Sequence, residues 1–487
     1  MVYFIRIVFF LGILCASGCS LAPKYHRPQM DVPASYKESG KWLHAKPQSA
    51  DLSRGPWWKM YNDPVLNALE EKVDCSNQTI KAALARYEQA RALAKVARSA
   101  YFPTVLGVTN ANRQKSSRYV ANTAQHPVFN DILVTANITY EVDLWGRVRN
   151  SVAAATYTAR ASAADLAAIN LSMHAELANN YFSLRGNDAA QYTLDQIVIM
   201  YEKALFLTKQ RFKGGASPVA DVDQAETQLQ TAKTLAADTR LKRAQLEHAI
   251  AVLIGEPAST FSIKPSIAAP HLVTINPDLP STLLERRPDV AESELAVLAA
   301  NANIGVARAA YFPAFNLSSG IGFESSTLAN LFKAPSLVWT LGSSALSILN
   351  SGNKPLLAQT IFDGGRIGGL TQEAWGKYKE TAANYRQTVL TAYREVEDNL
   401  VAIRQLDREN QTQTAATRSA NRALQQAMYR YKGGLITYLE VVFSQNIALE
   451  AELSSIDIRT RRQLASVELI KALGGGWERC CKRSVDT

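Results

Sequence analysis

The clearest pattern along the chain is an alternation of hydrophobic and polar residues between positions 132 and 144. The even positions are hydrophobic, and the odd positions after Leu133 carry Thr, Asn, Thr, Glu and Asp. Because successive side chains of a strand point to opposite faces, this period of two predicts a β-strand with one hydrophobic and one polar face. Such a strand is typical of a membrane β-barrel wall, which has lipid outside and water inside.

Directly after this strand, the sequence changes to a helical pattern. Positions 147–213 contain no proline, and Gly186 is the only glycine among them. A helix of this length extends for about 100 Å at about 1.5 Å per residue. Strand and helix together predict a helical tunnel that continues from a membrane pore.

The same order of elements occurs twice. Tyr101-Phe102-Pro103 recurs as Tyr311-Phe312-Pro313 at an offset of 210, and Arg211 to Gly215 aligns with Arg430 to Gly434 at an offset of 219. The difference falls within the second pair of predicted strands, where loops tolerate changes of length. The pattern therefore predicts an internal duplication.

The predicted organisation follows from this repeat. Residues 19–62 form an extended, proline-rich arm that Trp57 and Trp58 pack against the rest of the chain. Repeat 1 (63–255) contains a helix over 63–100, a β-hairpin over 104–145, the long helix 147–213 and a returning helix 219–254. After a linker over 256–281, repeat 2 (282–477) contains a helix, a β-hairpin over 314–363, the long helix 366–432 and a helix over 436–473, followed by a tail over 478–487. Positions 346–357 in the second hairpin look inserted.

The fold class that these elements predict is a mixed α/β membrane protein, mostly α. No segment after residue 18 is hydrophobic for the roughly 18 residues that a spanning helix needs, so a membrane crossing requires strands. Four strands cannot close a barrel, and lipid does not tolerate open sheet edges. Three chains would supply about twelve strands, enough for a channel. We therefore predict a homotrimer with a 12-stranded β-barrel, four strands per chain, continued by a long α-helical coiled-coil barrel.

The first 18 residues have the composition of a signal peptide. Arg6 precedes a hydrophobic run over 7–14, and small residues lead to Cys19 in Ala16-Ser17-Gly18-Cys19-Ser20. This arrangement resembles the bacterial lipobox, which implies cleavage between Gly18 and Cys19 and attachment of lipid to Cys19. Ser20 rather than an aspartate follows, which by the same resemblance favours the outer membrane. The alternative is an ordinary signal peptide in which the cysteine is incidental.

Composition argues against several other classes of function. The net charge of +10 is spread over predicted helices in which acidic and basic residues alternate, so we expect no nucleic-acid partner. The six histidines are scattered without paired partners. None of the five cysteines has zinc-site spacing; they are Cys15, Cys19, Cys75, Cys480 and Cys481. We therefore expect no catalytic residues, no metal site and no cofactor.

Several short motifs form a collinear set. They are Trp57-Trp58 with Asn62-Asp63-Pro64, Arg287-Pro288-Asp289-Val290, Ile304-Gly305 before Tyr311-Phe312-Pro313, Phe362-Asp363-Gly364-Gly365-Arg366, and Lys471 to Trp477. This set resembles the outer membrane factors of tripartite efflux systems, the TolC-like family, and most closely their lipoprotein branch. The resemblance covers roughly 19–477. It implies a homotrimeric conduit in the outer-membrane lipid that docks a periplasmic adaptor and an inner-membrane pump and exports drugs, metals or other toxic solutes.

The resemblance also indicates where a gate would lie. It places the turns Gly214-Gly215 and Gly433-Gly434 at the periplasmic tip, in contact with the adaptor. Members often carry an aspartate just after the glycine of the second turn, whereas this chain has Ile436. We expect Asp221, Asp223 and Glu440, together with Tyr438, to form the mouth instead; the alternative is that these acids only stabilise helix N-termini. Thr360 also departs from the family, which often has proline there, so the geometry of the fourth strand stays open.

Two alternative functions remain at this stage. A lipid-anchored periplasmic coiled-coil scaffold would explain the helices and Cys19, although it does not explain two symmetrically placed pairs of strands. A type I secretion conduit for polypeptides would have the same fold and a different cargo.

Overall fold

The computed structural model describes residues 20–30, 35–38, 56–115, 128–267, 286–341, 357–358 and 360–475. It divides into two compact units. The first, which we call the sheet unit, comprises residues 1–29, 87–162 and 293–385. The second, the helical unit, comprises residues 30–86, 163–292 and 386–487. Cys19 and Gly18, the predicted lipidation and cleavage positions, lie outside the described residues, as do Cys480 and Cys481.

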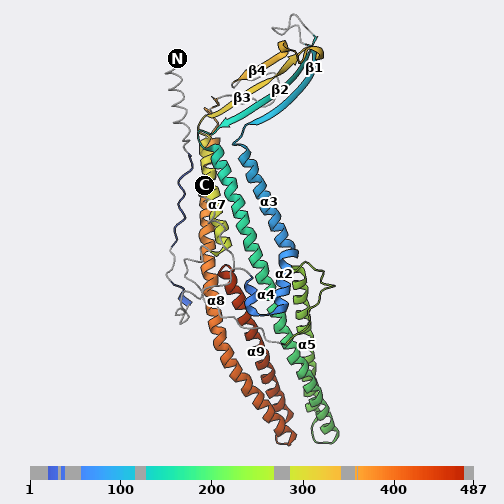
Figure 1. Ribbon diagram of the computed structural model, residues 1–487. Coiled ribbons are helices and arrows are strands. Elements are labelled where there is room, and N and C mark those ends of the chain that lie inside the picture. Colours follow the sequence, from blue (N-terminus) through green and yellow to red (C-terminus); the bar gives the residue numbers. More distant parts are fainter. Residues whose placement is uncertain are drawn as a thin grey trace. The chain divides into compact units, whose positions relative to one another are not determined.

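The sheet unit contains one antiparallel sheet (Figure 1). Its strands are β1 (Thr104–Lys115), β2 (Val128–Val142), β3 (Ala314–Ser325), β4 (Leu337–Leu341) and the short β5 (Leu357–Ala358). The order is β1-β2-β3-β4, and β5 pairs with the start of β3. The two predicted hairpins are therefore neighbours, joined through the β2–β3 pair.

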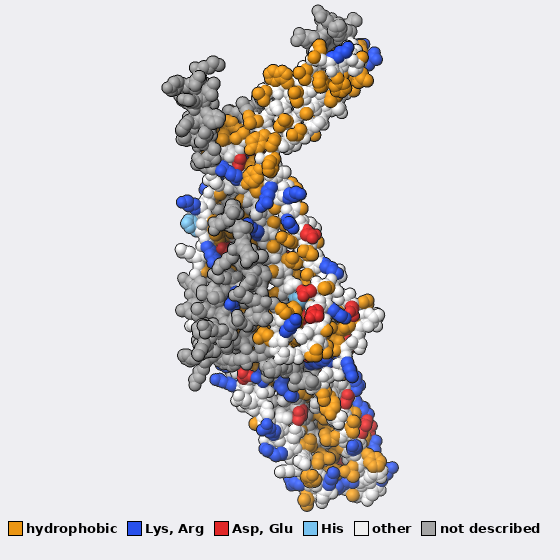
Figure 2. All heavy atoms as spheres, in the orientation of Figure 1, with side chains coloured by type: hydrophobic (Ala, Val, Ile, Leu, Met, Phe, Trp, Pro, Cys, Tyr) orange, Lys and Arg blue, Asp and Glu red, His pale blue; other side chains and the backbone are white. Residues whose placement is uncertain are grey.

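The register of β2 against β3 confirms the alternation seen in the sequence. Val134 pairs with Phe323, Tyr140 with Leu317 and Val142 with Phe315, which forms one hydrophobic face. The intervening pairs, such as Asn137 with Gly320, form the polar face. Several hydrophobic-face side chains are exposed, including Ile321 (56% exposed) and Trp339 (69%), and Figure 2 shows hydrophobic side chains gathered over the strands. The sheet unit thus presents a hydrophobic surface that its own described residues leave uncovered.

The fourth strand differs from the prediction. The second hairpin was expected to extend to residue 363, but β4 ends at Leu341, and the short β5 ends at Ala358. Ile361 and Phe362 lie outside any strand and are almost fully exposed. The chain turns there because the Asp363 carboxylate accepts hydrogen bonds from Gly365 N (3.0 Å) and Ile367 N (2.8 Å), which begins α8. Most of the segment over 346–357 lies outside the described residues.

The two long helices have the bounds expected from the sequence. These are α4 (Arg147–Lys213) and α8 (Arg366–Lys432), each of 67 residues. The shorter helices are α2 (Pro64–Ser76), α3 (Gln78–Ser99), α5 (Val219–Leu253), α7 (Pro288–Ala309) and α9 (Tyr438–Ala472), and a 3₁₀ turn, η3, spans Trp57–Tyr61. Within the described ranges, no helix has a stretch long and hydrophobic enough to cross a membrane.

The predicted single helix over 63–100 is wrong, because Asn77 divides it into α2 and α3. The Asn77 backbone is extended, and its side chain bonds on both sides. Its Nδ2 donates to Leu253 O (2.8 Å), while its Oδ1 accepts from Ile80 N (3.0 Å) and caps the start of α3. The Asn77 side chain thus satisfies the last carbonyl of α5 and the first turn of α3. These bonds make the break more favourable than a continuous helix.

A similar joint occurs in the second half of the chain. Arg287 Nη1 donates to Ala472 O (3.0 Å), as Asn77 does to Leu253 O, so both side chains satisfy the last carbonyls of a returning helix. Gly474 approaches Arg286 O so closely that a Cβ would lie 2.6 Å from it, and Gly255 has the same relation to Ser76 O at 2.7 Å. The residue offsets between these joints, 210 and 219, are those of the sequence repeat.

Candidate functional site at the two helix turns

The candidate site lies in the helical unit, where α4 turns into α5 and α8 into α9 (Figure 1). Each long helix ends in a Schellman motif. In the first turn, Gly215 N donates to Phe212 O (3.0 Å) and Ala216 N to Arg211 O (2.8 Å). Gly434 N and Leu435 N make the equivalent bonds to Tyr431 O and Arg430 O, both 3.0 Å long. The two turns are therefore geometrically equivalent.

The two glycines of each pair have different roles. Gly215 and Gly434 have a φ of +73°, a left-handed conformation that other residues adopt only at a cost. Gly214 and Gly433 do not have a positive φ. A Cβ at Gly433 would meet its nearest backbone atom at 3.5 Å, an ordinary contact distance. Only the second glycine of each pair is thus required by the turn.

A buried hydrophobic cluster joins all four helices beside these turns. It includes Tyr201 and Leu205 on α4, Ala225 and Leu229 on α5, Tyr431 on α8, and Tyr438 and Val441 on α9. Alanines at 225, 232 and 427 permit close approach of the helix backbones. The cluster means that displacement of one turn affects the packing of the other.

Arg211 and Tyr431 connect the two turns directly. Arg211 Nη1 donates to Tyr431 O at 3.0 Å, and the guanidinium carbon lies 4.7 Å from the centre of the Tyr431 ring. Tyr431 in turn packs on Tyr438, with ring centres 5.3 Å apart. Arg211 and Tyr431 were noted in the sequence only as repeat markers, so their role as a bridge was missed; the aligned Arg-Phe-Lys and Arg-Tyr-Lys motifs held the signal.

Tyr438 is the best-placed of the predicted gate residues. Its side chain is 1% exposed. Burial raises the pKa of the Tyr438 hydroxyl above its usual value, and the nearby Tyr431, Tyr201 and Asp221 raise it further. The Tyr438 hydroxyl therefore stays neutral, and Tyr438 marks a buried position between the two turns.

The three predicted acids have different surroundings. Asp221 is half-buried in the first turn of α5, and its charge contributes to the raised pKa of Tyr438 on α9. Glu440 lies in the first turn of α9 and is exposed, as is Asp223. Among the described residues, neither Asp223 nor Glu440 forms a side-chain ion pair or hydrogen bond with the other turn. Asp221 alone of the three is half-buried, and both Asp221 and Glu440 lie at the positive end of a helix dipole.

Some polar atoms in this packed region have no hydrogen-bond partner within the described structure. They are the Tyr431 hydroxyl, Arg211 Nε and both amide atoms of Gln445, a residue only 1% exposed. A buried unsatisfied polar group costs about 1–3 kcal/mol. The arrangement at the turns is therefore less favourable than its hydrophobic packing alone would suggest.

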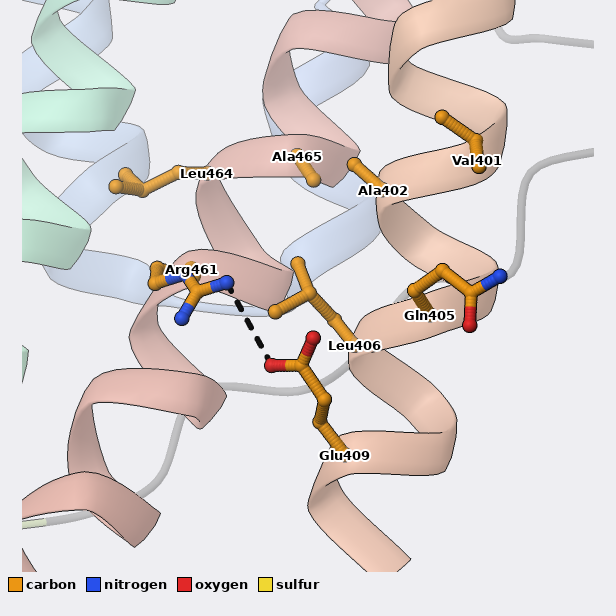
Figure 3. A pocket seen from close by; sticks show the side chains of 8 residues that line it. All are labelled: Val401, Ala402, Gln405, Leu406, Glu409, Arg461, Leu464 and Ala465. Carbon is orange, nitrogen blue, oxygen red and sulfur yellow. Dashed lines mark ion pairs between the residues drawn. The ribbon is translucent and has the colours of Figure 1, made fainter.

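The helical unit also has a concavity away from the turns, which is poorly suited to bind a ligand. It has a volume of about 330 Å³ and lies between α8 and α9, lined mainly by aliphatic groups such as Ala402, Leu406 and Ala465 (Figure 3). Arg461 and Glu409 form an ion pair of 3.6 Å beside it. No set of polar groups converges on this space, and we interpret it as a gap in helix packing.

The described residues contain no group of three or more His, Cys, Asp or Glu side chains arranged to hold a metal ion. The geometry of the candidate site is instead that of two coupled helix turns, held by hydrophobic packing and an arginine bridge. Such an arrangement is suited to a change in helix position.

Comparison with known proteins gives consistent matches. The family model for outer membrane efflux proteins matches residues 69–256 and 279–475. Outer membrane protein OprJ of Pseudomonas aeruginosa is 30% identical over 468 residues, which cover 96% of this chain and 94% of OprJ. Cation efflux system protein CusC of Escherichia coli O6:H1 is 27% identical over 480 residues, covering 96% of this chain and 98% of CusC. The solved structure of the Campylobacter jejuni CmeC outer membrane channel aligns with a TM-score of 0.85 at 25% identity, over 94% of this chain and 96% of that one.

Proposed function

Because the chain belongs to the outer membrane efflux protein family, we propose that it is the outer-membrane channel of a tripartite efflux system that exports drugs or other toxic small solutes. Its function as an outer membrane efflux channel, and not as an enzyme, follows from the family and from relatives such as OprJ and CusC. The assembly, the anchor, the gate and the cargo below are our proposals.

The observation that carries the proposal is the exposed hydrophobic face of the sheet. Ile321, Leu317 and Trp339 lie on one face and are all more than half exposed, whereas the opposite face carries Asn137, Thr139 and Gly320. Water disfavours an uncovered hydrophobic surface of this kind, and lipid on one side with an aqueous lumen on the other satisfies both faces.

The open edges of the sheet support a trimer. Within the described strands, β1 pairs only with β2, and β4 and β5 pair only with β3, so each chain has two free edges. Edges in lipid must be paired, and three four-stranded sheets would close into a 12-stranded barrel. We propose that the helices continue this barrel into the periplasm as a coiled coil, where the turns at Gly214-Gly215 and Gly433-Gly434 contact an adaptor that links the channel to an inner-membrane pump.

The two equivalent joints support an origin by internal duplication. The contacts of Asn77 with Leu253 and of Arg287 with Ala472 use different side chains for the same purpose. Both turns use the same hydrogen bonds as well. We propose repeat 1 over 63–255 and repeat 2 over 282–477, with the linker between them.

We propose that the two coupled turns form the gate. Arg211 bridges the turns through Tyr431, and Tyr438 packs on Tyr431. The unsatisfied Gln445 and Tyr431 atoms lower the free-energy cost of leaving this arrangement. Asp221, Asp223 and Glu440 form an acidic mouth in this proposal. Opening would then require the loss of a few specific contacts rather than the unfolding of a helix.

Our proposals for the membrane anchor and for the cargo are based on the sequence. We propose that a signal peptide over 1–18 is cleaved before Cys19 and that Cys19 is lipidated, which would place the chain at the outer membrane through lipid as well as strands. The cargo of the relatives varies, since CusC is named for cation efflux. The six methionines of this chain are scattered, which favours organic solutes over soft metal ions.

A pair of substitutions tests the membrane-facing surface. Trp339→Arg places a charge on the hydrophobic face, and Thr340→Arg places the same charge on the opposite face of the same strand. Arginine on the lipid side of a barrel costs up to about 2–4 kcal/mol. We expect Trp339→Arg to reduce the amount of assembled protein in the outer membrane and to increase susceptibility to toxic solutes, with Thr340→Arg assembling normally. Equal assembly of the two variants would contradict the proposal.

A further inference from the structure

A buried group of titratable side chains lies apart from the helix turns. His174 on α4 is 2% exposed and Glu70 on α2 is fully buried. The His174 Nδ1 atom lies 2.6 Å from Glu70 Oε2, and its Nε2 atom lies 3.0 Å from Asp74 Oδ1. Glu70 and Asp74 are one helical turn apart, so both carboxylates reach the same imidazole. This cluster joins α2 to α4 within the helical unit.

The surroundings hold the imidazole in one position. Trp58 stacks on His174 with ring centres 4.4 Å apart and an interplanar angle of 14°. Asn170 Nδ2 donates to Asp74 Oδ1 at 3.3 Å, which orients that carboxylate. A cavity of about 740 Å³ lies beside the cluster, and its other charged lining residues are Lys59 and Glu71. The ring is thus fixed on one face by the indole and at both nitrogens by carboxylates.

Both nitrogens of an imidazole donate only when the ring is protonated. Two acceptors therefore select the cationic form of His174, and loss of the proton would leave one carboxylate facing a nitrogen lone pair. Glu70 would then be a buried anion without a compensating cation. Lys59, the cation that lines the neighbouring cavity, forms no ion pair with Glu70. Glu70 Oε1 has no hydrogen-bond partner among the described residues, which increases the cost of that anion.

We propose that Glu70, His174 and Asp74 form a proton-dependent clamp that fastens α2 to α4 in acid and loosens as the pH rises. This device is independent of the efflux gate. It makes the attachment of α2, and of the η3 turn that carries Trp58, respond to the pH of the compartment.

The direction of this dependence follows from the two partners. The carboxylates raise the pKa of His174 even though burial alone would lower it. Burial raises the pKa of Glu70 to about 7, against the opposing effect of His174. In both cases the folded state holds the proton more tightly than the unfolded state. The stabilisation is therefore complete at acidic pH and is lost as the pH rises through neutrality.

Hydrogen exchange of the full-length protein in neutral detergent tests the clamp. After correction for intrinsic rates, amides of α2 (Pro64–Ser76) in the wild type should lose at least about tenfold protection between about pH 6 and about pH 9, since one pKa unit corresponds to a factor of ten. The double variant Glu70→Gln, His174→Gln should remove this pH dependence, because it removes both groups that hold a proton more tightly in the folded state. The matched control, His248→Gln, alters an exposed histidine on α5 and should leave the profile unchanged. Protection of α2 that stays constant or increases with pH in the wild type overturns the proposal.

A second measurement uses the wild-type protein alone, so it does not depend on whether a variant folds. NMR titration of imidazole-labelled wild-type protein follows the His174 ring directly. His174 should keep its proton at a pH at which the side chain of free histidine has lost it. Loss of the His174 proton at or below the pH of free histidine would overturn the clamp, whatever the exchange data show.

Discussion

Arg211 offers the sharpest test of the coupling between the two helix turns. Substitution by alanine removes the hydrogen bond to Tyr431 O and the contact with the Tyr431 ring. A hydrogen bond from a charged donor contributes about 1.5–3 kcal/mol, and the cation–π contact about 0.5–1 kcal/mol. Because Arg211 is only half-buried, water replaces part of this energy. The expected net loss of stabilisation of the coupled turns in Arg211→Ala is therefore about 2 kcal/mol.

This loss of energy shifts the equilibrium between closed and open channel only if the Arg211–Tyr431 contact exists in the closed state and is broken in the open state. A difference of about 2 kcal/mol corresponds to a change of about 30-fold in an equilibrium constant. In planar bilayers, the open probability of single Arg211→Ala channels should rise by about this factor. The bilayer recording separates gating from assembly, because only inserted channels are observed.

The internal repeat supplies the control for this experiment. Arg430 occupies the equivalent position of the second turn but is exposed. Arg430→Ala removes the same charge from the same region, and we expect it to leave the open probability within a fewfold of the wild type. Equal effects of the two substitutions would refute the bridge and would attribute the change to net charge alone.

Three further predictions concern the turns, the acidic mouth and the anchor. Gly434→Ala should destabilise the protein by about 1–2 kcal/mol in thermal unfolding, because its φ is +73°, whereas Gly433→Ala should be neutral or slightly stabilising; the same loss from both would show that the turn conformation is not the cause. Asp221→Asn should reduce the preference of the channel for cations, measured as a reversal potential in a salt gradient, and should do so more than Asp223→Asn, since Asp221 is half-buried and Asp223 is exposed to the screening solvent; an unchanged reversal potential in both would leave these acids as helix-capping groups. Cys19→Ala should abolish incorporation of labelled fatty acid but retain some trimer on native gels, and complete loss of the trimer would contradict a barrel that closes without the lipid.

The sequence predicted those features of the fold that depend on local periodicity. The alternation over 132–144 identified both faces of β2, because a side-chain period of two is a property of the single strand. The absence of proline and the glycine pair that follows each long helix predicted the bounds of α4 and α8. The pairing of β2 with β3 could be expected only in outline, since register between distant segments depends on tertiary contacts.

Tertiary contacts also explain the failures. The break at Asn77 depends on a bond to Leu253 O, 176 residues away, which no local pattern reveals. The split fourth strand depends on how the chain turns at Asp363 to enter α8. At the candidate site, the sequence suggested Tyr438 and the acids as candidates but not the Arg211–Tyr431 bridge, because neither Arg211 nor Tyr431 departs from an ordinary helix end when read alone. The buried His174 cluster was likewise invisible, since its members lie about 100 residues apart.

The central claim, a trimeric channel through the outer membrane, is tested most directly by measuring the mass and the single-channel conductance of the same purified, detergent-solubilised sample. We expect the mass of three chains, each lighter than the 53.4 kDa of the full sequence by the cleaved residues 1–18, plus lipid. We also expect a small conductance, with the channel closed for most of the time. A monomer without conductance would contradict the account.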